Sequence, residues 1–322
     1  MTTLVVVQRR GRHEETTHVV SAVLCDTGGN VRERIGPPLV TTWRSAAKPF
    51  QLETTASLLA PQVLGALSDA ELAIGAASHA GEPAHIELVR ALLRRFELDE
   101  HALQCGAHWP LDADAARRLA ALGREPTPIH NNCSGKHTFM AAACRTAGWA
   151  TDYRPPHHPL QRRIRARIDA RSGGDVHDEV VDGCGVPCYV MPLRAMATAW
   201  AHLAMAMAQG DDLLGRIGRA MQRNPHLVAG TGRMDTLLMQ RAREPLVSKV
   251  GAAGLVCLAI PSAHAGIALK VHDGDADARR IAACAVLMRL FPDLLPDPPE
   301  PEWFVVRNVV GDAVGQREAT WR

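Results

Sequence analysis

The stretch Trp43-Arg44-Ser45-Ala46-Ala47-Lys48-Pro49-Phe50 carries a serine and a lysine three residues apart. Residues three apart on a helix share a face, so we expect the Ser45 hydroxyl to meet the Lys48 amine. A serine hydroxyl becomes a useful nucleophile when a base takes its proton. A lysine serves as that base when burial or a nearby cation lowers its pKa toward neutrality, and the apolar neighbours favour burial. The same pattern also fits an ordinary helix start with an exposed lysine.

A second lysine follows late in the chain, in Lys249-Val250-Gly251, on a strand expected at 246–250. A Ser-x-x-Lys helix followed much later by a Lys-x-Gly strand is the chain order of the penicillin-recognising serine hydrolases. In that arrangement the second lysine lies across the cleft from the serine. The alternative is a strand-edge lysine before a turn glycine, and the spacing alone leaves both interpretations open.

Composition narrows the class of protein. The 322 residues are 47% hydrophobic, which is enough for one large domain or two closely packed ones. A net charge of +2 provides no basic field for nucleic acid. The opening apolar run is too short for a secretory signal, and no run approaches the roughly 18 apolar residues of a membrane span. We therefore expect a cytoplasmic protein without nucleic-acid or membrane partners, whose eight scattered cysteines form no disulfide framework.

The order of predicted elements is strands, a long helical middle, and strands again. We expect strands at 3–7, 17–25, 31–35, 246–250, 254–260 and 265–271, with a late edge strand at 304–307. We expect helices at 45–59, 69–79, 83–95, 112–122, 134–147, 159–171, 192–208, 211–222 and 276–290. The strands at the two ends must then pair across the helical insertion. This predicts an α/β sheet domain from 1–44 and 243–322, a mainly helical domain from 45–242, and an active site at their interface.

A third motif, Cys133-Ser134-Gly135-Lys136, allows more than one interpretation. It is not a Walker A loop, because His130 stands where that motif needs glycine and His137 where it needs serine or threonine. An anion site at a helix N-terminus is one possibility. A metal site is another: Cys184, in its own glycine-rich turn, can join Cys133 and Lys136, and two thiolates favour zinc. Lysine is a rare ligand, since it must first lose its proton.

Five motifs in this order resemble the asparaginase II family of the Rhizobium etli type. They lie at 44–51, 78–82, 131–137, 182–187 and 249–251. The resemblance covers essentially the whole chain. It implies the serine β-lactamase and glutaminase-like fold, an antiparallel sheet flanked by helices with a large helical insertion. It also implies a homodimer that hydrolyses L-asparagine to L-aspartate and ammonia.

The resemblance also assigns residues to the reaction. It implies two adjacent Ser–Lys pairs, which here match Ser45–Lys48 and Ser78–Lys249. Lys270, on the next strand in the same region, competes with Lys249 for the second pair. Ser45 is the expected nucleophile, with Lys48 as its base and an acyl-enzyme as the intermediate.

The remaining expectations concern the metal and the substrate. The resemblance implies a zinc ion held by the residues that match Cys133, Lys136 and Cys184, with water as a further ligand. We expect the zinc to organise the polar end of the substrate. Asp182 is the expected partner of the substrate α-ammonium group, and the other expected substrate-binding residues are Arg44, His137 and Glu82.

Three alternative functions stay open. One is a zinc-dependent amidohydrolase in which Ser45 is incidental. A second is a glutaminase, because glutamine differs from asparagine by one methylene and pocket depth cannot be read from sequence. The third is a non-catalytic binder of amino acids on a hydrolase scaffold.

Overall fold

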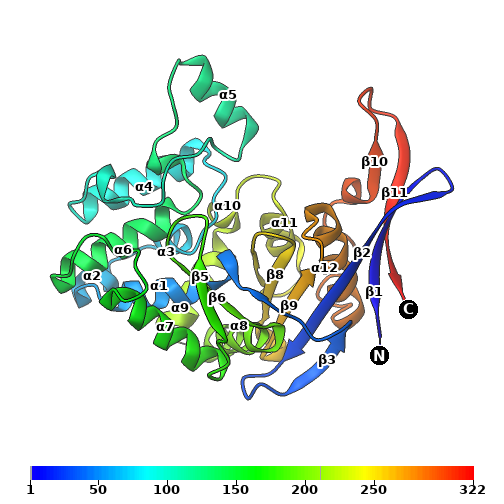
Figure 1. The fold of residues 1–322 in the computed structure, drawn as a ribbon, viewed down its shortest axis with the longest axis horizontal. Coiled ribbons are helices and arrows are strands. Elements are labelled where there is room, and N and C mark those ends of the chain that lie inside the picture. The colour runs from blue at the N-terminus through cyan, green and yellow to red at the C-terminus, as the bar shows by residue number, and fades with distance from the viewer. Residues whose placement is uncertain (1, 211) are drawn as a thin grey trace.

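Both ends of the chain contribute to one antiparallel sheet. The computed structural model describes residues 2–210 and 212–322, and within them the sheet has eight strands. Its order is β10 (Val305–Arg307), β11 (Ala313–Trp321), β1 (Leu4–Arg10), β2 (His13–Cys25), β9 (Ala265–Val271), β8 (Leu255–Ile260) and β7 (Val247–Val250), with β3 (Val31–Ile35) paired to β2. The pairing of β2 with β9 joins the N-terminal and C-terminal segments. The expected pairing across the helical insertion is therefore confirmed (Figure 1).

The helices follow the predicted order closely. The short 3₁₀ turns are η1 (Arg44–Ala47), η2 (Glu100–Ala102), η3 (Pro128–His130), η4 (Pro261–Ala263) and η5 (Pro301–Phe304). The first α-helices are α1 (Lys48–Ser57), α2 (Pro61–Gly65), α3 (Asp69–Gly75), α4 (Pro83–Arg95), α5 (Ala113–Ala121) and α6 (Ser134–Ala147). The later ones are α7 (Pro159–Ser172), α8 (Leu193–Gln209), α9 (Leu213–Arg223), α10 (Pro225–Val228), α11 (Met234–Arg241) and α12 (Ala276–Leu290). None of the described helices is long and apolar enough to cross a bilayer.

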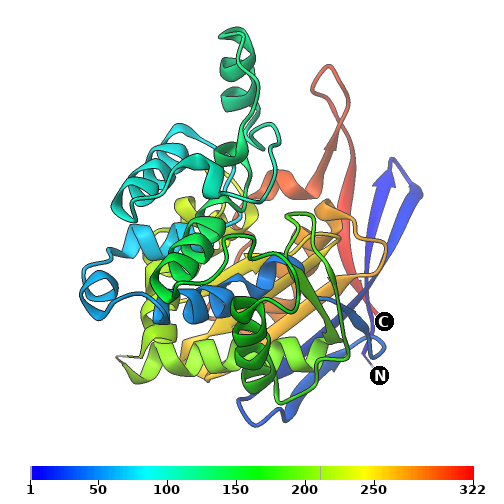
Figure 2. The same cartoon turned by 60° about the vertical axis from the view of Figure 1, so that its left-hand side comes forward.

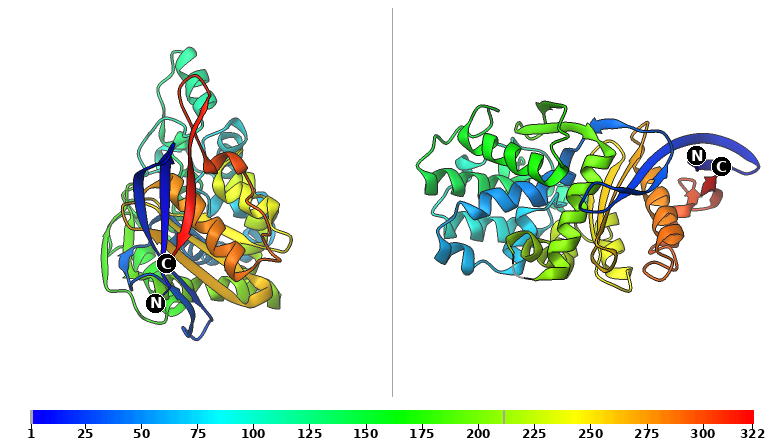
Figure 3. Two further views of the ribbon diagram at one scale, coloured as in Figure 1. Left: turned by 90° about the vertical axis from the view of Figure 1, so that its right-hand side faces the viewer. Right: turned by 90° about the horizontal axis from the view of Figure 1, so that it is seen from below.

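Helices α8 and α12 cover opposite faces of the sheet (Figure 3). Strands β8 and β9 are buried along their whole length because both faces are covered. Gly266 on β9 lets α8 approach so closely: a Cβ there would lie 2.2 Å from Ala197 O and 2.3 Å from Ala201 N. The apolar core between α8 and the sheet continues into the helices α1, α3, α6 and α7. A second core lies between the sheet and α12.

A smaller three-stranded sheet was not expected from the sequence. It consists of β4 (Val40–Thr42), β6 (Pro187–Pro192) and β5 (Asp178–Val181). Helix α5 extends away from the body, and the β1–β2 and β10–β11 hairpins project on another side (Figure 2). The division into a sheet domain and a helical domain stays a prediction. In the structure, α8 from the helical segment is part of the sheet's own core.

Three differences from the predicted elements bear on the site. The helix expected to begin at Ser45 starts at Lys48, after the 3₁₀ turn η1. The helix expected to reach residue 79 ends at Gly75, so Ser78 lies in a loop. The nine-residue strand β11 was missed because its residues are mostly only half-buried and show no apolar run.

Candidate active site

The first expected serine lies in a strained turn. Arg44, directly before Ser45, has a φ of 49°, which a non-glycine residue rarely adopts. The turn η1 packs against β7 and β8, and Trp200 Nε1 donates a hydrogen bond to Ala46 O at 3.2 Å. Ser45 is half-buried. The backbone of this turn is therefore held by the sheet and by α8 while the serine keeps access to solvent.

All the lysines of this protein lie in its interior. The chain has only four lysines, at positions 48, 136, 249 and 270, and the other cationic residues are arginines. All four lysines are buried, with at most 7% of their surface exposed. A buried lysine is costly as a cation and readily loses its proton, whereas arginine keeps its charge. This distribution is that of a protein that uses lysine for proton transfer or metal binding.

Lys48 contacts the second expected serine rather than the first. Its Nζ donates hydrogen bonds to Ala77 O at 2.5 Å, to Ser78 Oγ at 2.8 Å and to Asn132 O at 3.5 Å. These bonds use all three donors of an ammonium group, and none of them reaches Ser45. The expected Ser45–Lys48 hydrogen bond is thus absent from the described structure. The long side chain instead reaches oxygens from two loops that converge behind it.

The loop that carries Ser78 is fixed at both ends of the serine. Ser78 N–H donates to Val228 O at 2.9 Å, and His79 N–H donates to Asn132 O at 3.2 Å. The His79 ring is fully buried, with Nε2 2.8 Å from Ser134 Oγ. Burial lowers the pKa of His79 well below its ordinary value, so the ring is neutral. Ser78 is half-buried beside Lys48.

Lys249 is the lysine whose environment favours the neutral form most clearly. It lies on β7, is fully buried and donates to Val250 O at 2.9 Å. Burial lowers its pKa to about 7, and the charge of Lys48 acts in the same direction. Lys270, its competitor, lies on β9 and donates to Val271 O and His272 O. Lys249, and not Lys270, is the lysine that feels the charge of Lys48.

The cysteines and the lysine of the expected metal site do come together. Cys133 and Lys136 lie at the start of α6, and Cys184 lies in the turn between β5 and β6. Lys136 Nζ is 3.0 Å from Cys184 Sγ. Gly135 lets this end of α6 reach α3, because a Cβ there would lie 2.2 Å from Ile74 O.

The charges in this cluster are coupled. A hydrogen bond from the Cys184 thiol lowers the pKa of Cys133 well below its usual range. Burial would lower the pKa of Lys136, but Cys184 and Cys133 raise it above its ordinary value. These shifts favour an ammonium form of Lys136 and a thiolate form of Cys133 within one buried cluster.

The adjacent histidine presents a bare nitrogen. The Tyr153 hydroxyl donates to Ala102 O at 3.1 Å and accepts from Gln104 N–H at 3.1 Å. Its one hydrogen is thus used, so His137 Nδ1, 2.9 Å away, must donate to it. His137 Nε2 then carries a lone pair, is fully buried and has no hydrogen-bond partner among the described residues. Burial lowers the pKa of His137 to about 4, which keeps this nitrogen unprotonated.

This donor set fits zinc. Two sulfurs and a nitrogen are ligands that zinc prefers, and His137 lies beside Cys184 in the same buried cluster. Zinc ligands at about 2.0–2.3 Å in tetrahedral geometry lie about 3.6 Å apart. The 3.0 Å between Lys136 and Cys184 therefore needs to open by only about half an ångström. The described residues contain no group of three or more His, Cys, Asp or Glu suited to a metal, and the candidate site accordingly includes Lys136.

Two of the expected substrate-binding residues pair with each other. Arg44 Nε donates to Asp182 Oδ1 at 2.6 Å, which links the Ser45 turn to the Cys184 turn. Burial would raise the pKa of Asp182, but Lys136 and Arg44 lower it below its ordinary value. Asp182 is therefore ionised, as an ammonium-binding group must be.

Glu82 is engaged by the protein itself. Its Oε1 accepts from Thr231 N–H at 2.7 Å and its Oε2 accepts from Thr231 Oγ1 at 3.0 Å. Both carboxylate oxygens thus hold the glycine-rich loop 230–235 against the Ser78 loop. The geometry is that of a loop brace, and the expected contact of Glu82 with substrate would have to displace these bonds.

No motif in the sequence marks Asp235, which the structure places beside Lys249. Its Oδ2 lies 3.8 Å from Lys249 Nζ, and both side chains are fully buried. An aspartate at the start of a helix is most simply interpreted as a favourable charge at the helix N-terminus. The sequence signal nearest to it is the glycine-rich stretch Gly230-Thr231-Gly232, which predicts a loop before a helix.

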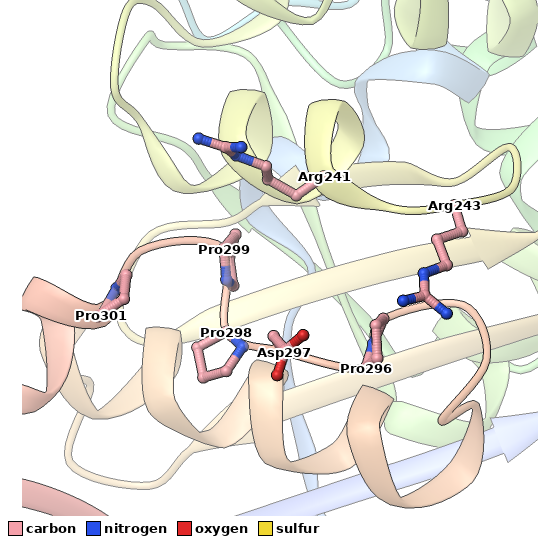
Figure 4. A pocket seen from close by; sticks show the side chains of 7 residues that line it. All are labelled: Arg241, Arg243, Pro296, Asp297, Pro298, Pro299 and Pro301. Atoms are coloured by element: carbon pink, nitrogen blue, oxygen red, sulfur yellow. The ribbon is translucent and has the colours of Figure 1, made fainter.

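A large surface cavity lies away from these residues. It has a volume of about 380 Å³ and is lined by Arg241, Arg243, Asp297 and four prolines, at 296, 298, 299 and 301 (Figure 4). The two arginines are exposed, and the lining holds no nucleophile and no desolvated base. The chemistry of the Ser–Lys cluster therefore belongs to a different place in the fold.

Comparison with known proteins identifies the family. The sequence profile of the L-asparaginase II family matches residues 5–314. No curated protein sequence matches the chain.

Similar solved structures include two of Mglu. The native form in 4.3 M NaCl has 14% identity, a TM-score of 0.45, and coverage of 86% of this chain and 62% of that one. The L-glutamate-binding form has 14% identity, a TM-score of 0.45, and coverage of 90% and 65%. Simvastatin synthase (LovD) from Aspergillus terreus, in its LovD6 mutant, has 12% identity, a TM-score of 0.40, and coverage of 81% and 87%. The chain spans less than two thirds of the length of either Mglu structure.

Proposed function

The chain belongs to the L-asparaginase II family, and on that premise we propose that it is an L-asparaginase of the Rhizobium etli type. It hydrolyses the side-chain amide of L-asparagine to L-aspartate and ammonia. The observation that carries the proposal is the buried cluster of Lys48, Ser78 and Lys249, next to the strained turn of Ser45. A lysine that is partly neutral near physiological pH, close to a second lysine and to two half-buried serines, can activate a hydroxyl and return its proton.

The proposed reaction begins at Ser45. Its hydroxyl oxygen attacks the amide carbon, and its proton passes to the lysine pair. Lys249 is the acceptor, because its pKa of about 7 leaves it partly neutral near physiological pH. Lys48 stays a fixed donor to Ser78 and keeps Lys249 from holding its proton tightly. This exchanges the roles that the sequence suggested, in which Lys48 was the base.

The rest of the cycle returns that proton. The tetrahedral intermediate collapses, the C–N bond breaks, and the proton leaves with the nitrogen as ammonia. This leaves an aspartyl ester on Ser45. A water molecule then attacks the ester carbon and gives a proton to Lys249. The bond between the ester carbon and Ser45 Oγ breaks, Lys249 returns the proton to Oγ, and L-aspartate is released. Ser78, hydrogen-bonded to Lys48, would help to pass a proton to the leaving group.

Asp182 and the metal site would bind the polar end of the substrate. The ionised Asp182 is suited to the substrate α-ammonium group, and Arg44 is suited to its α-carboxylate once their mutual pairing opens. Cys133, Lys136 and Cys184 would hold a zinc ion, which supplies a fixed positive charge beside these groups. His137 would stay neutral and present its Nε2 lone pair to the same cluster. A homodimer, implied by the family resemblance, is proposed on the same basis.

The experiment is an ammonia-release assay with asparagine, glutamine and a β-lactam. We expect turnover of asparagine to exceed that of the other two. Ser45→Ala should abolish turnover, and Ser78→Ala should lower it while leaving a measurable rate. Ser57→Ala is the matched control, because Ser57 is exposed at the end of α1 and bonds only to Thr54 O among the described residues.

The same assay separates the alternatives. Retained activity in Ser45→Ala would transfer the nucleophile role away from Ser45. Faster glutamine turnover would make the protein a glutaminase. A rise in melting temperature with asparagine but no ammonia would indicate a non-catalytic binder. Complete loss of activity on chelation, with Ser45 intact, would favour a zinc-dependent amidohydrolase.

A further inference from the structure

We propose that Asp235 is a positioning residue that holds Lys249 in place for the reaction. The inference rests on the proposed function, in which Lys249 is the proton acceptor. Asp235 is the second residue of α11, and only 1% of its surface is exposed. Its role follows from what its two carboxylate oxygens contact.

The carboxylate binds the residues on both sides of Lys249. Oδ1 accepts from Ser248 Oγ at 2.6 Å, and Oδ2 accepts from Val250 N–H at 2.9 Å. Strand β7 is the edge of the sheet, so its outer N–H groups have no strand partner. At Val250 the Asp235 carboxylate accepts the hydrogen bond that a neighbouring strand would otherwise accept. The backbone on either side of Lys249 is therefore fixed to α11, which sets the direction of the lysine side chain.

The same carboxylate acts on the lysine charge. Oδ2 is 3.8 Å from Lys249 Nζ, close enough for an ion pair but too far for a hydrogen bond. The other charged or titratable groups that face Lys249 are Lys48 on α1, Arg279 on α12 and Cys133 before α6. Asp235 is thus the carboxylate that offsets two neighbouring cations. Without it, Lys249 would be held in the neutral form over a wider pH range.

Asp235 is itself held in position. The Thr236 hydroxyl donates to Gly230 O at 2.6 Å, and its oxygen also lies 3.1 Å from Pro225 O. Glu82 fixes the same loop through Thr231. The loop therefore connects the Ser78 segment, through Glu82, to the strand of Lys249, which Asp235 contacts.

The test is the pH profile of kcat/KM for asparagine in Asp235→Asn. Removing an opposite charge at this distance lowers the pKa of an amine by about one to three units. We therefore expect the acidic limb of the profile to move by that amount to lower pH, with a fall in kcat. Ser248→Ala is the matched control: it removes a hydrogen bond to the same carboxylate but no charge, so the limb should stay in place. An unmoved limb in Asp235→Asn would reduce Asp235 to a structural residue and overturn the proposal.

Two further measurements keep the outcome decisive. If Asp235→Asn does not fold, Asp235→Glu can be used, because it keeps the charge but displaces it. We then expect the acidic limb of the kcat/KM profile to stay at its wild-type pH and kcat to fall at least tenfold. A wild-type kcat in Asp235→Glu would contradict the positioning role. If the wild-type protein releases no ammonia, the proposed function fails while Asp235 can still be tested. The chain has only four lysines, so the ¹³Cε signal of Lys249 can be titrated by NMR, and an identical midpoint in Asp235→Asn would overturn the proposal.

Discussion

Replacing Lys249 by methionine should remove a specific part of the protein's pH-dependent stability. In the folded protein the pKa of this lysine is lowered to about 7 because the side chain is fully buried. In the unfolded chain it returns to about 10.4. Between these values the unfolded state holds a proton that the folded state lacks. The free energy of unfolding therefore rises with pH across this window. Below pH 7 both states hold the proton, and the cost of burying it is fully present.

The size of the effect follows from the two pKa values. Their separation of about 3.4 units corresponds to a cost of about 5 kcal/mol at low pH. The cost is about 4 kcal/mol at about pH 7 and about 3 kcal/mol at about pH 8.5. The wild-type protein should therefore gain about 1–2 kcal/mol from this lysine between the two pH values. Methionine fills similar space and does not titrate, so Lys249→Met should lack this gain.

Urea unfolding at both pH values measures the difference. The cysteines and histidines that also titrate are common to both proteins, so comparing the two changes isolates Lys249. Lys270→Met is the matched control, because Lys270 lies outside the Ser–Lys cluster and keeps some solvent contact; it should reduce the gain by less. If wild type and Lys249→Met change equally between the two pH values, Lys249 is charged when folded and cannot be the base.

Three other predictions concern packing, the loop brace and the metal. Gly266→Ala should cost about 1–3 kcal/mol, because its Cβ would overlap the backbone of α8. At about 1.5 °C per kcal/mol for a chain of this size, Tm should fall by about 2–5 °C. Gly65→Ala, with open space around it, should leave Tm nearly unchanged, and similar Tm values for the two variants would contradict the packing argument. Glu82→Gln should cost about 1–3 kcal/mol, since Thr231 loses a charged acceptor, and should lower kcat/KM; a wild-type Tm and rate would exclude the brace. Removing zinc, followed by metal analysis and steady-state kinetics, should raise KM more than it lowers kcat, and the reverse would assign the metal to the chemistry.

The local pattern of apolar residues was enough to predict most of the strands and helices. The apolar runs at 255–260 and 265–271 and the capped helix at 276–290 were predicted almost to the residue, because burial of both sheet faces leaves an uninterrupted apolar signal. Strand β11 was missed, since its pairing with β1 comes from contact at the far end of the chain and its own residues alternate weakly. The short strands β4, β5 and β6 carry too few residues for any periodicity.

For the candidate site, as for the fold, some features follow from the sequence and others only from the structure. The sequence was enough to identify the reactive side chains, because they lie in recognisable motifs: Ser45, Lys48, Ser78, Cys133, Lys136, Cys184 and Lys249. Three of the four lysines of the chain belong to these motifs. The sequence did not show which of these side chains contact each other. Sequence spacing joined Lys48 to Ser45, whereas the structure joins it to Ser78, because three loop oxygens converge on the buried amine. Glu82, expected to bind substrate, has both carboxylate oxygens on Thr231, and Asp235, which belongs to none of the five motifs, contacts the strand of Lys249.

The sequence by itself therefore determined the family, the order of strands and helices, and the set of reactive side chains in the Ser45 turn and its four partner motifs. Only the tertiary structure brings Lys48 to Ser78 and buries Lys249 beside Asp235. A side chain's pKa depends on how much water surrounds it and which charges lie within a few ångströms. Those neighbours, Lys48 and Asp235 around Lys249, are far apart in the chain and meet only when the helices close on the sheet.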